Sequence, residues 1–250
     1  MILAVDVGNT QTVFGLFDGS QLADQYRVAT NRSHTGDELA LMLRALVSLD
    51  SLDGIVLCSS VPPLVREYEA FARRWADVEL LVLGPTVPMG LTIRYDDPRE
   101  VGADRLANAV AVRERHGAPA VVVDFGTSTN FDVVNAAGEF AGGVLAPGIE
   151  ISMDALFDRA ARLPRVPFVA PERVISQTTV AALQSGMVYG FAGQVDAIVE
   201  RIEEELQAPG APVVATGGLA ELIAPHTRTI TAVDAELTLH GLRLVWDANH

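Results

Sequence analysis

The stretch Ile2-Leu3-Ala4-Val5-Asp6-Val7-Gly8-Asn9-Thr10 is an apolar run that ends in an aspartate and turns through a glycine and a hydroxyl residue. The pattern returns at Val121-Val122-Val123-Asp124-Phe125-Gly126-Thr127-Ser128. A strand that ends in this way presents a carboxylate, a permissive glycine and free backbone N–H groups at one tip, which are the groups needed to hold a metal-bound phosphate. The repeat predicts two related lobes that face one ligand.

Each copy continues as an antiparallel meander, followed by alternating helices and strands. Meander strands are expected near 2–7, 12–17 and 21–28, and again near 119–124, 130–135 and 139–145. Thr35 followed three residues later by Glu38 predicts a capping box and a helix to about Leu49. Further elements are expected as strands at 54–59, 79–83 and 212–216, and as helices at 64–76, 101–116, about 179–206 and from about 235. This order predicts mixed α/β sheets covered by helices.

The predicted boundary between the lobes lies after the helix near 101–116, which we interpret as a bridge. The first lobe, 1–115, contains the first phosphate motif and the bridging helix. The second, 116–250, contains the second phosphate motif and Thr216-Gly217-Gly218, a strand-to-helix junction suited to a nucleoside.

The charge of the chain narrows the classes of function. The formal net charge is −14, which disfavours nucleic acid and anionic membranes as partners. All 18 basic residues are arginine, so the P-loop lysine, the protein-kinase strand lysine and a pyridoxal Schiff base are excluded. If phosphate is bound, backbone amides, arginine and a metal must bind it.

Cys58 is the single cysteine and follows the apolar run Ile55-Val56-Leu57, which predicts a buried strand thiol. No run approaches 18 apolar residues, and no basic region precedes an apolar stretch at the N-terminus. We therefore expect a cytoplasmic protein with no membrane partner.

Gly102-Ala103-Asp104-Arg105 lies in the first turn of the bridging helix. An acid there is common for structural reasons, because the helix dipole stabilises it. The functional interpretation is that Asp104 accepts a proton from an attacking hydroxyl while Arg105 binds an anionic group. Each phosphate motif has a similar structural alternative, a tight hairpin whose aspartate caps the turn.

The motifs taken in order carry a family resemblance. They are Asp6-Val7-Gly8-Asn9-Thr10, Val13-Phe14-Gly15, Asp18-Gly19, Tyr95, the run from Asp97 to Arg105, Asp124-Phe125-Gly126-Thr127, the run from Gly142 to Gly148, Gln184-Ser185-Gly186 and the run from Ala215 to Gly218. This set resembles the type III pantothenate kinase family, within the actin, Hsp70 and sugar-kinase superfamily. The implied fold is α/β, with two duplicated ribonuclease-H-like lobes whose mixed β-sheets are flanked by helices, an actin-like ATPase fold.

The resemblance implies ATP-dependent phosphorylation of pantothenate to 4′-phosphopantothenate, the first step of coenzyme A biosynthesis, by a homodimer. It implies that ATP, which carries a magnesium ion, is bound by Asp6, Val7, Gly8, Asn9, Thr10, Gln11, Thr12, Val13 and Thr127. It implies that pantothenate is bound by Tyr95, Gly102, Ala103, Asp104, Arg105 and Thr179. Asp104 would be the proton acceptor, and Asp124 would bind a potassium or ammonium ion.

One segment departs from the family pattern, since Ser176-Gln177-Thr178-Thr179 stands where many relatives carry Gly-Lys-Asn-Thr. Two alternatives to the pantothenate kinase remain. One is another small-alcohol kinase or a phosphatase of the same fold, and the other is a non-catalytic nucleotide-binding accessory protein.

Overall fold

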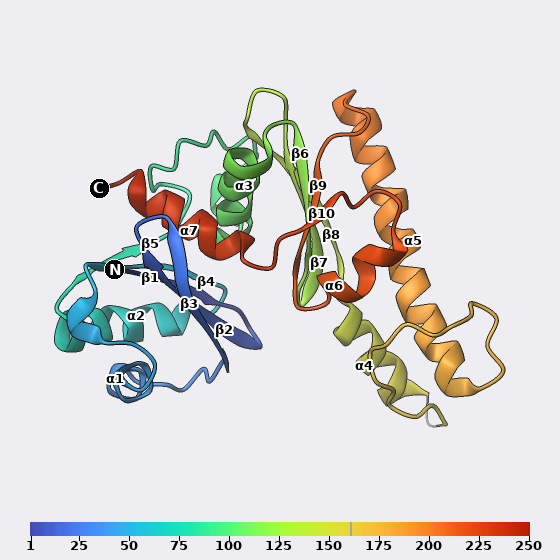
Figure 1. The fold of residues 1–250 in the computed structure, drawn as a ribbon, viewed down its shortest axis with the longest axis horizontal. Helices are drawn as coiled ribbons and strands as arrows, with labels where there is room; N and C mark the ends of the chain where they lie inside the picture. The colour runs from blue at the N-terminus through green and yellow to red at the C-terminus, as the bar shows by residue number, and fades with distance from the viewer. Residues whose placement is uncertain (161) are drawn as a thin grey trace. The chain divides into compact units, whose positions relative to one another are not determined.

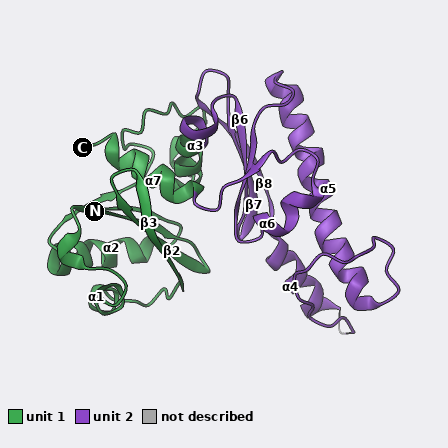
Figure 2. Ribbon diagram, in the orientation of Figure 1, with its two compact units in different colours: residues 1–111, 237–250 green, residues 112–236 purple. Residues whose placement is uncertain are grey.

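The computed structural model describes residues 1–160 and 162–250. They form two compact units (Figure 2). Unit 1 comprises Met1–Ala111 and Leu237–His250, and unit 2 comprises Val112–Glu236. The C-terminal segment therefore lies in unit 1, although it was predicted to belong to the second lobe. The boundary at 111 falls within the helix that was expected to bridge the lobes.

The sheet of unit 1 has the strand order β3-β2-β1-β4-β5. Its strands are β1 (Ile2–Val7), β2 (Gln11–Asp18), β3 (Gln21–Ala29), β4 (Gly54–Ser59) and β5 (Glu79–Val82). β1, β2 and β3 form the predicted antiparallel meander, and β4 and β5 run parallel to β1. The parallel pairing places Cys58 directly opposite Asp6.

The helical elements of unit 1 follow the predicted order, with shorter bounds in the first helix. They are α1 (Gly36–Arg44), a 3₁₀ turn (Leu49–Ser51), α2 (Pro62–Phe71) with its π-helical continuation (Ala72–Ala76), a 3₁₀ turn (Pro98–Glu100), most of α3 (Ala103–His116) and α7 (Leu237–Asp247). The capping box is confirmed, because the Thr35 hydroxyl accepts from the Glu38 N–H and the Glu38 carboxylate accepts from the Thr35 N–H.

α7 packs on β1 and β4 and completes the core of unit 1 (Figure 1). Gly54 and Gly241 make this packing possible. The Trp246 indole occupies the space that a Cβ on Gly54 would need. A Cβ on Gly241 would lie 2.5 Å from the carbonyl carbon of Ala107, so α7 and α3 approach backbone to backbone.

The sheet of unit 2 repeats the arrangement of unit 1, with the order β10-β9-β6-β7-β8. Its strands are β6 (Ala120–Phe125), β7 (Ser128–Val134), β8 (Phe140–Pro147), β9 (Val213–Gly217) and β10 (Ala232–Val233). β6, β7 and β8 are antiparallel, while β9 and β10 run parallel to β6. The internal repeat therefore corresponds to a duplicated sheet, as predicted.

Helices α4 (Ile149–Arg159), α5 (Thr179–Leu206) and α6 (Ala220–Ile223), with a 3₁₀ turn (Ala224–His226), complete unit 2. α5 was predicted with these bounds, whereas α4 was not predicted. The core includes Val121 and Val123 of β6 together with Val188, Val195 and Val199 of α5. None of the helices formed by the described residues has the length and apolar character needed to cross a membrane.

Candidate active site

The first phosphate motif forms the tight connection between β1 and β2. The Gly8 N–H donates to the Gln11 carbonyl over 3.0 Å, and a Cβ on Gly8 would lie 2.9 Å from that oxygen. Thr30, just past β3, braces the turn because its hydroxyl donates to the Gly8 carbonyl over 2.7 Å and its N–H donates to the Thr10 carbonyl. The backbone of the motif is thereby fixed by protein contacts.

The predicted nucleotide residues in this motif differ in exposure. Asn9, Thr10 and Gln11 are exposed, and Gly8 is half-buried. Val7 and Thr12 are buried, and the Thr12 hydroxyl lies 2.9 Å from that of Thr30. A phosphate can therefore reach the backbone and side chains of residues 8–11. Val7 and Thr12 are inaccessible to it and support the turn from the protein interior. Val13 is half-buried and pairs with Asp6 across β1 and β2.

Asp6 is the half-buried carboxylate at the end of β1. Burial and the negative charge of Asp104 raise its pKa from 3.8 to about 6, although a hydrogen bond from Cys58 and the charge of Arg27 act in the opposite direction. The Cys58 Sγ donates to Asp6 Oδ1 over 3.2 Å. Two neighbouring carboxylates of this kind suit a divalent cation, which prefers oxygen ligands and would relieve their repulsion.

The buried thiol predicted at Cys58 is confirmed, since the side chain is fully inaccessible. Its contact with Asp6 was not predicted, because it depends on the register between β1 and β4. Burial, followed by the charges of Asp6 and Asp104, raises the Cys58 pKa well above its ordinary value, so the thiol stays protonated and acts as a donor.

Asp104 stands in the first turn of α3, where its Oδ1 accepts from the Arg105 N–H over 2.9 Å. A Cβ on Gly102 would lie 2.5 Å from this oxygen, so glycine makes room for the carboxylate. The Arg105 side chain is buried, and Tyr95 lies half-buried in the loop that precedes α3. The structure thus brings Asp104 within electrostatic reach of Asp6 in unit 1.

The second phosphate motif joins β6 to β7 in unit 2. The Gly126 N–H donates to the Ser128 carbonyl over 3.0 Å, and Thr127 is exposed beside it. Asp124 pairs with Thr216 on the adjacent β9, and a Cβ on Gly217 would lie 2.6 Å from Asp124 Oδ1. The structure therefore brings the predicted cation residue and the predicted nucleoside motif together.

Thr179 lies in unit 2, apart in the chain from the other residues predicted to bind pantothenate. It is the first residue of α5 and is exposed. The preceding Thr178 is the N-cap, whose hydroxyl accepts from the Ala181 N–H over 3.2 Å. The departure from the family pattern at residues 176–178 therefore supplies a working helix cap.

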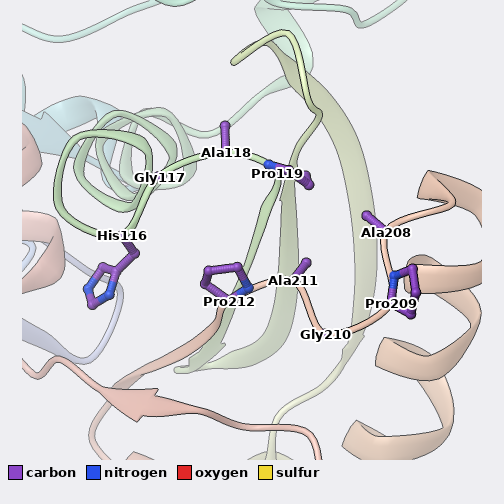
Figure 3. Close-up of a pocket in the computed structure, with 9 residues that line it drawn as sticks. All are labelled: His116, Gly117, Ala118, Pro119, Ala208, Pro209, Gly210, Ala211 and Pro212. Atoms are coloured by element: carbon purple, nitrogen blue, oxygen red, sulfur yellow. The ribbon is translucent and has the colours of Figure 1, made fainter.

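A separate pocket in unit 2 contains none of the predicted site residues (Figure 3). It lies between the segment that ends α3 and the loop that enters β9. Its lining consists of His116, Gly117, Ala118, Pro119, Ala208, Pro209, Gly210, Ala211 and Pro212. In the part of the chain that the structure describes, no group of three or more histidine, cysteine or acidic residues is placed to hold a metal ion.

Solved structures share this fold. A Baf family protein of Campylobacter jejuni superposes with a TM-score of 0.62 at 16% identity, covering 99% of this chain and 98% of that one. A ROK family protein of Streptococcus pneumoniae, in complex with sucrose, superposes with a TM-score of 0.53 at 14% identity, covering 98% and 97%. The predicted actin-like ATPase fold is confirmed.

Sequence comparison identifies the family. Residues 2–201 match the family described as type III pantothenate kinase. A type III pantothenate kinase of Acidothermus cellulolyticus is 52% identical over the whole of this chain and 99% of its own length. The chain therefore belongs to the type III pantothenate kinase family, which phosphorylates pantothenate in coenzyme A biosynthesis.

Proposed function

We propose a division of roles for the phosphorylation of pantothenate by this chain. The exposed turn at residues 8–11 binds the phosphates of ATP, Asp6 faces their magnesium ion, and Asp104 accepts the proton of the pantothenate hydroxyl. The observation that carries this proposal is the exposed turn at residues 8–11, whose backbone is fixed by hydrogen bonds to Gln11 and Thr30 shortly after Asp6. The negative charge of Asp104, which raises the Asp6 pKa, supports a role for both carboxylates at this turn. The chain is 52% identical, over its whole length, to a type III pantothenate kinase. This similarity favours the phosphorylation of pantothenate over the reactions of another alcohol kinase or a phosphatase, and over a non-catalytic accessory role.

Phosphoryl transfer needs in-line placement, neutralisation of charge and a group that orients or deprotonates the nucleophile. The rigid turn around Gly8 offers N–H groups to phosphate oxygens without reorganisation. Asp104 takes the hydroxyl proton as the new O–P bond forms and the bond to the departing ADP breaks. Magnesium, when bound with ATP, neutralises charge on the phosphates. Cys58 remains protonated and donates to Asp6, so it is not a nucleophile.

We assign pantothenate binding to Tyr95, Gly102, Ala103, Asp104, Arg105 and Thr179. The buried Arg105 guanidinium supplies the positive charge that a carboxylate substrate requires. In unit 2 we assign Thr127 to ATP and Asp124 to a potassium or ammonium ion. Asp124 is half-buried, and Gly217 leaves open the space beside Asp124 Oδ1 that a Cβ would fill; both features support a small ion at this carboxylate.

We further propose a cytoplasmic homodimer in which a second copy covers the apolar surface of β8 and α4. β8 is the edge strand of its sheet, and Leu145 is 62% exposed on it. Ile151, on the adjoining α4, is 49% exposed. Exposed apolar side chains at an unpaired sheet edge are typical of an association surface.

The dimer is tested by light scattering on wild type, Leu145→Asp and Leu41→Asp. Leu41 is 72% exposed on α1 of unit 1 and serves as the matched control. We expect twice the chain mass of 26.6 kDa for wild type and for Leu41→Asp, and a monomer for Leu145→Asp. A wild-type mass of one chain would refute the proposal.

The reaction is tested by ADP release from purified protein with magnesium ATP and pantothenate in potassium, ammonium or sodium salts. We expect turnover with pantothenate in preference to other small alcohols, and stimulation by potassium or ammonium. The variant Asp124→Asn should lose the cation dependence. Absence of turnover in every salt would contradict the proposed reaction, whereas cation-independent turnover would contradict only the role of Asp124.

A further inference from the structure

Two arginines hold the side chains of the exposed β1–β2 turn. Arg27 Nη1 donates to Gln11 Oε1 over 2.9 Å, and Arg32 Nη2 donates to Asn9 Oδ1 over 2.9 Å. Neither arginine was singled out in the sequence. Because the chain has no lysine, any side-chain ammonium is excluded as a partner for phosphates at this turn.

The fold places both arginines beside the turn. Arg27 lies on β3 opposite Val13 of β2. Arg32 follows shortly after Thr30, which is bonded to the carbonyls of Gly8 and Thr10. The backbone that carries the two guanidinium groups is therefore anchored to the turn itself, while the side chains remain exposed and able to exchange partners.

The present partners of both arginines are neutral amide oxygens, which are weak acceptors compared with an anion. Hydrogen bonds between charged groups are roughly twice as strong as neutral ones, and a guanidinium matches phosphate oxygens with two parallel donors. An incoming polyphosphate would therefore displace Gln11 and Asn9 from the arginines. The positive charge of Arg27 already acts at the turn, because it lowers the Asp6 pKa.

We propose that Arg27 and Arg32 bind the phosphates of the nucleotide at the β1–β2 turn, and that Gln11 and Asn9 hold the two guanidinium groups in place when no nucleotide is bound. This inference rests on the proposed assignment of residues 8–11 to ATP. Arg27 and Arg32 would supply the positive charge that residues 8–11 lack.

The test uses the single variants Arg27→Gln and Arg32→Gln, the charge-preserving variants Arg27→Lys and Arg32→Lys, and the control Arg66→Gln. Arg66 is exposed on α2 of the same unit. We measure KM for MgATP and for pantothenate, kcat, and the Kd of MgADP by calorimetry. Loss of one charge-assisted contact predicts a KM for MgATP and a Kd for MgADP raised about 10-fold in each glutamine variant. KM for pantothenate should stay within about 2-fold, and lysine should restore part of the loss.

Three outcomes would overturn the inference: unchanged nucleotide affinity in both glutamine variants, a rise confined to the KM for pantothenate, or an equal loss in the Arg66 control. Gly8→Ala separates this failure from failure of the ATP assignment, because its Cβ would disturb the turn. If folded Gly8→Ala binds MgADP as wild type does, residues 8–11 do not bind the nucleotide. If it binds weakly while both glutamine variants bind normally, only the role of the arginines is refuted.

Discussion

Replacing Asp6 with asparagine is expected to stabilise the nucleotide-free protein while it impairs catalysis. The folded-state pKa of Asp6, about 6, lies above its ordinary value of 3.8 because partial burial and the negative charge of Asp104 both disfavour the ionised carboxylate. At neutral pH the folded state therefore holds a charge that the unfolded state carries more easily. This penalty is absent below pH 4, grows as the pH rises, and is complete above pH 6.

The size of the effect follows from the shift in pKa. A change of roughly 2 pKa units corresponds to about 3 kcal/mol at 1.36 kcal/mol per unit. At pH 7.5 we therefore expect Asp6→Asn to raise the free energy of unfolding of unit 1 by up to about 3 kcal/mol, and at pH 4.5 by no more than about 1 kcal/mol. The asparagine oxygen can still accept from the Cys58 thiol, so the variant leaves that hydrogen bond in place.

Tryptophan fluorescence during urea unfolding measures this effect in unit 1 alone, because both tryptophans, Trp75 and Trp246, belong to it. Asp18→Asn, which removes an exposed carboxylate at the end of β2, is the control and should give no comparable gain. The reasoning is refuted if Asp6→Asn is no more stable than wild type at pH 7.5, or if its gain is the same at pH 4.5.

Three other substitutions test the site and the fold. Asp104→Asn should lower kcat at least ~100-fold with unchanged near-UV circular dichroism; near-normal turnover would leave Asp104 with a structural role. Gly241→Ala should destabilise unit 1 by about 2 kcal/mol in fluorescence-detected unfolding, since its Cβ meets the backbone of Ala107; wild-type stability would contradict the close packing of α7. Cys58→Ala should raise the Asp6 pKa and move the acidic limb of the kcat/KM profile to higher pH, whereas Cys58→Ser should not; identical profiles would show that the thiol has no such effect.

Much of the fold could be predicted from the sequence, because helix caps, helix bounds and strand-turn-strand motifs depend on residues that are close together in the chain. The capping box at Thr35 and the bounds of α5 follow from residues close in sequence, and the repeated aspartate motif predicted the duplicated meander. Helix α4 was missed because Ile151 and Leu156 are exposed on it, which obscures the periodicity of a buried face.

The contacts that the sequence did not predict depend on pairing between segments far apart in the chain. The contact between Cys58 and Asp6 depends on β4 lying parallel to β1 in one register, and the contacts of Arg27 and Arg32 depend on how β3 and the segment after it meet the turn. Likewise, the pattern of α7 predicts a buried helix but does not say which sheet it covers. The aspartates of the candidate site could be found from motifs, whereas the groups that hold them required the tertiary structure.

The discontinuity of unit 1 bears on how the chain folds during synthesis. Unit 2 is a single stretch, Val112–Glu236, so it can fold once that stretch has emerged from the ribosome. Unit 1 begins earlier but ends later, because α7 supplies Trp246 against Gly54. A chain that stops at residue 236 would contain every residue assigned to catalysis and yet lack the helix that packs on β1 and β4. The domain that is synthesised first is therefore the last to be completed.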